Sequence, residues 1–208
     1  MSVAILQIGE RIRAERARRG VSLRSLARSV GLSPSLISQI ETGKCRPSVS
    51  TLYAITTALG VSVEDVFEEP GAPDGKVAVG EPVDGHAAVG QAVVAQAPVV
   101  VQEGEREVLE LDSGVTWERL GHVPGSHVDF LRVSYAPGGS SSGTGRLMRH
   151  VGTEYGYLIE GELVVTLGFR SHRLLPGDSI SFASSTPHSY RNEGTAPAVG
   201  IWFVAEAD

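Results

Sequence analysis

The sequence lacks the features of a membrane or exported protein. It has a single cysteine, Cys45, which excludes a disulfide within the chain and is typical of a reducing compartment. No apolar run approaches the roughly 18–20 residues that cross a bilayer. The N-terminal segment places its basic cluster after a short apolar patch, the reverse of the order in a signal peptide. We therefore expect a cytoplasmic protein with no membrane partner.

Charge is distributed unevenly along the 208 residues, whose net charge is −6. Residues 1–60 carry nine Lys and Arg against three acidic residues, whereas residues 70–208 carry nine against seventeen. A basic end on an acidic body is typical of a nucleic-acid-binding module joined to another domain. Charge alone leaves one alternative open, which is a single solvent-exposed basic helix.

Short amphipathic segments follow one another through the first 69 residues. Apolar residues recur at helical spacing, serines stand at cap positions and glycines follow the last turns. Pro34 directly after Ser33 marks a helix start, because proline in the first helical position loses no intrahelical hydrogen bond. The pattern predicts a compact bundle of five short helices, over residues 3–19, 23–30, 34–42, 50–59 and 62–67.

The remainder of the chain changes character twice. Residues 70–98 hold four prolines and five glycines with no sustained period, which predicts a flexible linker. From residue 99 onward, runs rich in Val, Ile, Phe and Tyr alternate with turn dipeptides, which predicts eight to ten strands in a sandwich or barrel. Gly161 lies between two alternating arms and predicts a tight hairpin. We expect domains at 1–69 and 99–208, joined by the linker 70–98.

The second and third predicted helices form a helix-turn-helix pattern. On the third, apolar residues face inward and leave a small, uncharged, hydrogen-bonding face that can approach base edges in the major groove. Gln39 is the candidate for direct readout, because its amide can bind an adenine edge at two points. Nearby cations are candidates for phosphate contacts. The candidates are Ser35, Ser38, Gln39 and Thr42 for the bases, and Arg24, Lys44 and Arg46 for the phosphates.

These residues carry a family resemblance. Residues 8–67 resemble the helix-turn-helix domain of the XRE family, related to phage lambda repressor and Cro, through the stretch from Leu32 to Lys44 and the tripeptide at 46–48. The resemblance implies a five-helix lambda-repressor-like bundle that binds double-stranded DNA. It also implies that residues from Ser33 and Pro34 to Gln39 enter the groove, and that Glu41 helps to hold the turn. A bundle that binds no DNA is the alternative.

Residues 145–161 and 175–192 resemble the two motifs of the cupin superfamily, small β-barrels of the jelly-roll type. The resemblance covers about residues 105–205 and implies a metal site of three histidines and one glutamate. His150, Glu154 and His188 match that pattern, but Met148 stands at the first histidine position, and a thioether is a poor ligand for Fe, Mn, Ni or Zn. The three matching residues are the ligand set of non-haem iron(II) sites.

A small-molecule effector pocket is expected beside these motifs, with Met148, Tyr157 and Tyr190 as its candidate residues. Side chains alternate along a strand, so Tyr157 is expected on the face opposite to Glu154, and the candidates cannot all line one pocket.

Together the two resemblances predict a multidomain α + β protein, a transcription regulator whose cupin domain senses a small molecule. We expect a homodimer on a palindromic operator. Two alternatives stay open, and the ligand set does not separate a regulator from an iron enzyme, because it occurs in both. One is a non-haem iron epoxidase or oxygenase with an appended helix-turn-helix domain, and the other is a metal-free isomerase or binding barrel.

Overall fold

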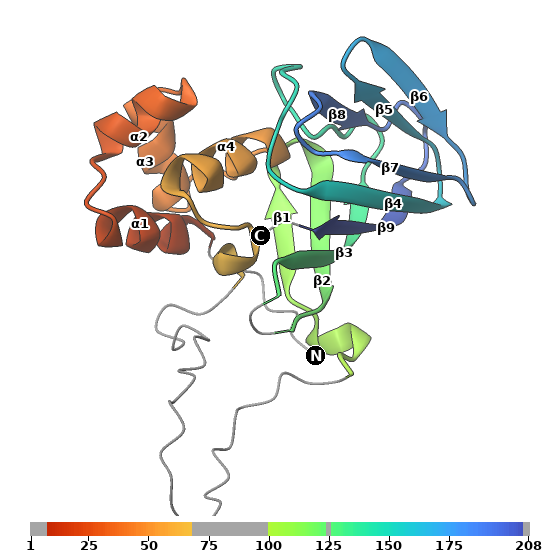
Figure 1. Cartoon of the computed structure of the whole chain (residues 1–208), viewed down its shortest axis with the longest axis horizontal. Helices are drawn as coiled ribbons and strands as arrows, with labels where there is room; N and C mark the ends of the chain where they lie inside the picture. The colour runs from red at the N-terminus through yellow and green to blue at the C-terminus, as the bar shows by residue number, and fades with distance from the viewer. Residues whose placement is uncertain (1–7, 68–99, 124–125, 206–208) are drawn as a thin grey trace, which may run out of the picture.

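The computed structural model describes residues 8–67, 100–123 and 126–205 (Figure 1). The predicted linker at 70–98 and the first residues of the first predicted helix lie outside this part of the chain, so the proposed domain boundaries stay predictions. No helix of the described residues is both long enough and apolar enough to span a bilayer.

Four α-helices form the N-terminal domain, and serine caps define three of their starts. The side chains of Ser22, Ser33 and Ser48 each accept a hydrogen bond from a backbone N–H of the first turn. Gly31 and Gly60 take left-handed conformations after the second and fourth helices. The helices are α1 (Ile8–Arg18), α2 (Leu23–Val30), α3 (Pro34–Glu41) and α4 (Val49–Leu59).

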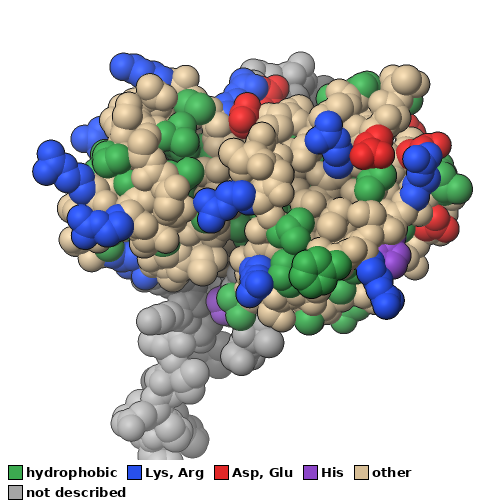
Figure 2. Space-filling model, turned by 90° about the horizontal axis from the view of Figure 1, so that it is seen from above, with side chains coloured by type: hydrophobic (Ala, Val, Ile, Leu, Met, Phe, Trp, Pro, Cys, Tyr) green, Lys and Arg blue, Asp and Glu red, His purple; other side chains and the backbone are tan. Residues whose placement is uncertain are grey.

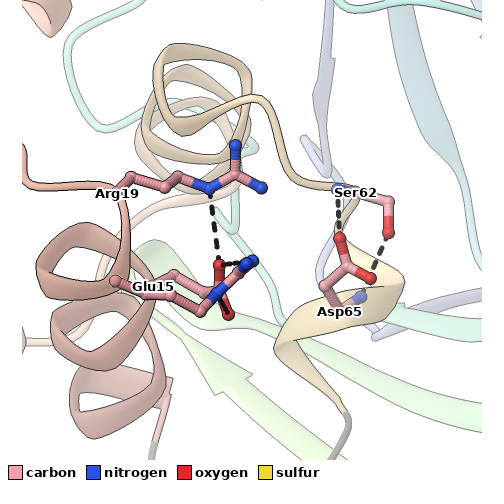
Figure 3. Close-up of polar contacts among 5 residues, drawn as sticks. Glu15, Arg19, Ser62 and Asp65 are labelled. Carbon is pink, nitrogen blue, oxygen red and sulfur yellow. Dashed lines mark hydrogen bonds and ion pairs between the residues drawn. The ribbon is translucent and has the colours of Figure 1, made fainter. Parts of the chain in front are cut away.

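The predicted fifth helix is wrong. The segment makes only a single 3₁₀ turn, η1 (Glu64–Val66). Figure 3 shows how it is held: the Ser62 N–H donates to the Asp65 carboxylate at 2.8 Å, and the Asp65 N–H donates to the Ser62 hydroxyl at 3.1 Å. This reciprocal cap satisfies the first turn, but six residues are too few to propagate a helix. The turn buries Val63 and Phe67 instead.

Among the described residues of the C-terminal part, nine strands form two antiparallel sheets. The six-stranded sheet has the order β1 (Val108–Leu111), β2 (Val115–Gly121), β3 (Val128–Tyr135), β9 (Ala198–Ala205), β4 (Thr153–Glu160) and β7 (Ser179–Ala183). The three-stranded sheet has the order β6 (Arg170–Leu174), β5 (Leu163–Leu167) and β8 (His188–Arg191). The expected number of strands is therefore confirmed.

The expectation of a closed barrel is not met. Beside β8 runs the Gly- and Ser-rich connection between β3 and β4, which makes only isolated bridges, Ser140 with Arg191 and Met148 with His188. Backbone hydrogen bonds such as that from the Ser141 N–H to the Tyr190 carbonyl at 2.9 Å continue along this edge, but the connection forms no regular strand, so no continuous ladder closes the barrel.

The hairpin predicted at Gly161 is also wrong. This glycine has a positive φ of 74°, but β4 pairs with β7 and β9, whereas β5 pairs with β6 and β8. The chain therefore crosses between the sheets at Gly161. A side chain there would meet the Pro197 carbonyl oxygen at 2.2 Å from its Cβ, so the crossing requires glycine.

The helical and β parts pack directly on each other through α4 (Figure 1). The Ser50 N–H donates to the Ser141 carbonyl at 2.9 Å, and the Asp112 N–H donates to the Pro47 carbonyl at 2.9 Å. Buried apolar residues of both parts belong to one continuous hydrophobic cluster. The N-terminal end of α4 is thus fixed to the β-domain.

Glu41 connects α3 to α1 through a largely buried ion pair. Its two carboxylate oxygens accept from Nε and Nη2 of Arg16 at 2.5 and 2.9 Å, and its side chain is 4% exposed. On the same helix α1, Glu15 pairs with the exposed Arg18 and with Arg19 (Figure 3). Glu41 is buried and joins two helices, whereas Glu15 is more exposed and contacts arginines three and four residues further along the chain, so the two carboxylates can be compared.

We predict that Glu41→Gln lowers the free energy of unfolding by about 1–3 kcal/mol, because Arg16 loses a charged, bidentate partner in a buried place. Glu15→Gln should change it by less than about 1 kcal/mol, because water screens exposed pairs. Urea unfolding followed by circular dichroism measures both changes. Equal losses in the two variants would contradict a structural role for Glu41.

Candidate functional site

The exposed face of α3 is the first candidate site. Ile37 and Ile40 are buried against the other helices, whereas Ser35 and Gln39 are exposed and Ser38 is half-buried. The α3 helix therefore displays the predicted hydrogen-bonding groups to solvent.

Two of the candidate groups on α3 already have intramolecular roles. The Ser33 hydroxyl caps the helix by accepting from the Leu36 N–H at 3.1 Å, and the Thr42 hydroxyl donates to the Ser38 carbonyl at 2.8 Å. Pro34 occupies the first turn and is exposed. Ser35, Ser38 and Gln39 are thus the better placed residues for base contacts.

Lys and Arg side chains surround the helical end of the molecule. On the face drawn in Figure 2, this end shows Lys and Arg but no acidic side chains, which gather over the β end. Arg24 and Lys44 are exposed. Arg46 differs from the expectation, because its guanidinium pairs with Glu110 of the β-domain at 2.5 Å.

The second candidate site lies inside the β-domain, where His150, Glu154 and His188 meet. His150 precedes β4, Glu154 is on β4 and His188 begins β8. Their side chains are only 2%, 3% and 0% exposed. The Glu154 Oε1 atom lies 2.8 Å from Nε2 of His150 and 2.9 Å from Nε2 of His188.

Both imidazoles are oriented by backbone carbonyls. Nδ1 of His188 lies 2.7 Å from the Thr186 carbonyl oxygen, and Nδ1 of His150 lies 3.1 Å from that of Val151. A carbonyl accepts, so each ring carries a proton on Nδ1 and turns its Nε2 atom toward Glu154.

The three converging atoms fit a metal ion. Among the described residues, the two Nε2 atoms and the Glu154 Oε1 have no hydrogen bond of acceptable geometry, although all are buried. Such orphaned polar atoms are costly in a protein interior. Two ligands at right angles around one ion, each about 2.1 Å from it, lie about 3 Å apart, close to the two separations from the Glu154 Oε1, and all three atoms lie within 4.8 Å of one another.

The electrostatics keep Glu154 ionised. Burial alone raises its pKa, but the contacts with His150 and His188 outweigh that effect and lower the pKa to about 2. Its second oxygen accepts from the Tyr190 hydroxyl, which in turn accepts from Nε1 of Trp202 at 3.2 Å. Burial and the Glu154 charge raise the pKa of Tyr190, so this phenol stays a donor.

A small cavity lies beside Glu154. Its volume is about 20 Å³, which is room for about one water molecule. Met148 and Tyr190 line the cavity as expected candidates, joined by apolar and aromatic side chains from both domains: Val49, Tyr53, Trp117, Leu131, Val133, Tyr135, Trp202 and Val204.

Tyr157 does not line this cavity. It is 50% exposed on the opposite face of β4, because Glu154, Gly156 and Leu158 are the residues of that strand that point inward. Tyr157 lines a separate surface hollow with Tyr155 and Phe203, so its place in an effector pocket stays a prediction.

Sequence reasoning missed the residues that α4 contributes. The Tyr53 ring stacks on the His150 imidazole with centroids 3.9 Å apart and an interplanar angle of 5°. In the sequence, Val49 and Tyr53 follow the helical period of ordinary core residues. Nothing local distinguishes them, because the contact joins residues almost 100 positions apart.

Comparison with known proteins identifies both domains. A family model described as a helix-turn-helix domain matches residues 7–68, and one described as a cupin domain matches residues 131–204. The HTH-type transcriptional regulator PuuR from Escherichia coli strain K12 is 31% identical over 194 residues, covering 92% of this chain and 91% of its own. The chain belongs to the XRE family of helix-turn-helix regulators with a C-terminal cupin domain.

Solved structures support the fold of this regulator. The crystal structure of an HTH_3 family transcriptional regulator from Vibrio cholerae aligns over 97% of this chain and 96% of its own, with a TM-score of 0.63 and 21% identity. A hydroxypropylphosphonic acid epoxidase from S. wedmorenis aligns over 98% and 100%, with a TM-score of 0.45 and 19% identity. The second likeness is too small to bear on activity.

Proposed function

We propose that this regulator binds a specific operator through α3 and adjusts that binding to a small-molecule effector in its cupin domain. The observation that carries the proposal is the exposed polar face of α3, flanked by cations. The similarity to PuuR over both domains supports it.

On the operator, Gln39 reads a base edge, with Ser35 and Ser38 beside it, and Arg24 and Lys44 contact phosphates. A cytoplasmic homodimer presents two such faces to a palindromic site, with half-sites about one helical turn apart. Nη2 of Arg46 pairs with Glu110, so the other N–H groups of its guanidinium are the candidates for a phosphate contact.

We predict that Gln39→Ala reduces discrimination between operator and scrambled DNA by about 1–3 kcal/mol, because a bidentate base contact is lost. Gln102→Ala, an exposed glutamine of the β part, is the matched control. Fluorescence anisotropy with the DNA upstream of the protein's own gene measures the ratio of affinities. An unchanged ratio in Gln39→Ala would contradict the assignment.

Arg24→Ala should weaken binding to operator and scrambled DNA alike and reduce the slope of log affinity against log salt by about 1, because one phosphate contact is lost. Arg170→Ala, an exposed arginine on β6, is the control. Titrations at several salt concentrations measure the slope. A slope equal to that of the control would argue against a phosphate contact at Arg24.

We propose further that His150, Glu154 and His188 hold a divalent metal, with Fe, Mn, Ni and Zn as the candidates. The two neutral imidazoles and the ionised carboxylate supply suitable nitrogen and oxygen ligands, and Tyr190 holds the carboxylate in place. A bound ion would supply open coordination positions to a ligand. Met148 lines the same cavity as a weak, soft neighbour.

Elemental analysis of protein purified without chelators tests the metal site. The double variant His150→Ala/His188→Ala should lose the metal, and Tyr190→Phe should lower metal affinity about 10–100-fold, because outer partners orient the ligands. His172→Ala, an exposed histidine on β6, should keep it. Equal metal content in the double variant and His172→Ala would exclude the triad.

An iron-dependent oxidase or epoxidase is the second candidate function, favoured by the two-histidine, one-carboxylate ligand set. It requires consumption of oxygen or peroxide with a small organic acid, in proportion to bound iron, and loss of consumption in His150→Ala/His188→Ala. The regulator requires an operator instead, so oxygen uptake and DNA binding measured on one preparation separate the two functions.

A further inference from the structure

The DNA-binding domain supplies one wall of the cupin cavity. Val49 and Tyr53 lie one turn apart on α4, are 1% and 4% exposed, and both line the cavity that contains Glu154. The Tyr53 ring covers the His150 imidazole and meets Trp117 edge-on at 6.0 Å between centroids. The cavity is therefore completed by a helix from outside the cupin domain.

The same α4 helix belongs to the core of the DNA-binding bundle. Leu52, Ile55 and Leu59 are buried with residues of the other helices in the apolar cluster. A packed interior transmits displacement, because its side chains interdigitate with few voids. A shift of α4 that lifts Tyr53 from His150 would therefore also move the bundle that carries α3 relative to the β-domain.

The cavity is too small for an effector while Tyr53 is docked. Its volume accommodates about one water molecule, and the walls are bulky aromatic and aliphatic side chains. A ligand larger than water reaches Glu154 and the histidines only when one wall moves. The α4 wall is held at its N-terminal end by polar contacts: two backbone hydrogen bonds, at Ser50 and Pro47, and the exposed Arg46–Glu110 pair.

We propose that Tyr53 is the lid of the effector site, so that ligand occupancy and the docked position of the helix-turn-helix domain exclude each other. The regulatory role of this lid rests on the function proposed above. The effector that fits the opened site is a small molecule with an apolar body, which packs on the aromatic wall, and one polar end, which contacts His150, Glu154 and His188. Its binding shifts the population of docked and undocked molecules, which changes operator affinity.

A reversible disulfide tests the lid without knowledge of the effector. Ser50→Cys and Ser141→Cys, placed in a Cys45→Ser background, join α4 to the β-domain where their backbones hydrogen-bond at 2.9 Å. Both tryptophans of the chain, Trp117 and Trp202, line the cavity, so acrylamide quenching of their fluorescence reports access. Thr166→Cys/Ser171→Cys, on paired strands of the small sheet, is the control disulfide.

If Tyr53 is the lid, the oxidised Ser50→Cys/Ser141→Cys variant should show less quenching of its tryptophans by acrylamide and slower uptake of Zn²⁺. A reducing agent should restore both. The control disulfide should change neither. Unchanged quenching in the oxidised Ser50→Cys/Ser141→Cys variant would overturn the lid. Acrylamide quenching depends on neither DNA nor a bound metal. It therefore tests the lid independently of the proposed function, which fails if the protein binds no operator.

Tyr53 variants test the contact by a second route. Tyr53→Phe keeps the stacked ring, whereas Tyr53→Leu fills less of the wall and should increase acrylamide access more than Tyr53→Phe does. In the wild type, a saturating concentration of a ligand about as small as acrylamide, such as imidazole, should change the affinity for the operator about fivefold or more. In Tyr53→Leu most of that change should be lost. Equal quenching in Tyr53→Phe and Tyr53→Leu would contradict the role of the ring.

Discussion

The packing of α4 between two hydrophobic interiors is the constraint on which the rest of the structure depends. One side of the helix completes the DNA-binding bundle, and the other places Tyr53 against His150. A single helix therefore carries both surfaces. In the mechanism that we propose, this helix connects the cupin cavity to the DNA-binding face without a separate transmission element.

The buried cluster of His150, Glu154 and His188 is a second constraint on the structure, because it places a charge where water is excluded. Glu154 stays ionised between two imidazoles, and Tyr190 and Trp202 continue the chain of donors behind it. Buried networks of this kind are stable only when every member has a partner. The unpaired Nε2 atoms leave one position for a further group, which is why a cation fits the chemistry of the site.

Local signals in the sequence predict much of this arrangement. Ser33 and Pro34 mark the start of α3 and so place Gln39 outside, and strand alternation separates Glu154 from Tyr157. Long-range contacts are not predictable in this way. The crossing at Gly161, the Arg46–Glu110 pair and the stacking of Tyr53 on His150 each join residues that only the folded chain brings together.

The central claim is that this chain binds specific DNA as a symmetric regulator, and sequencing of genomic fragments captured by the purified protein tests it most directly. The account predicts enrichment of a few sites that share an inverted repeat, with half-sites about one helical turn apart. Capture of fragments without a common sequence, at the level of bare resin, would contradict it.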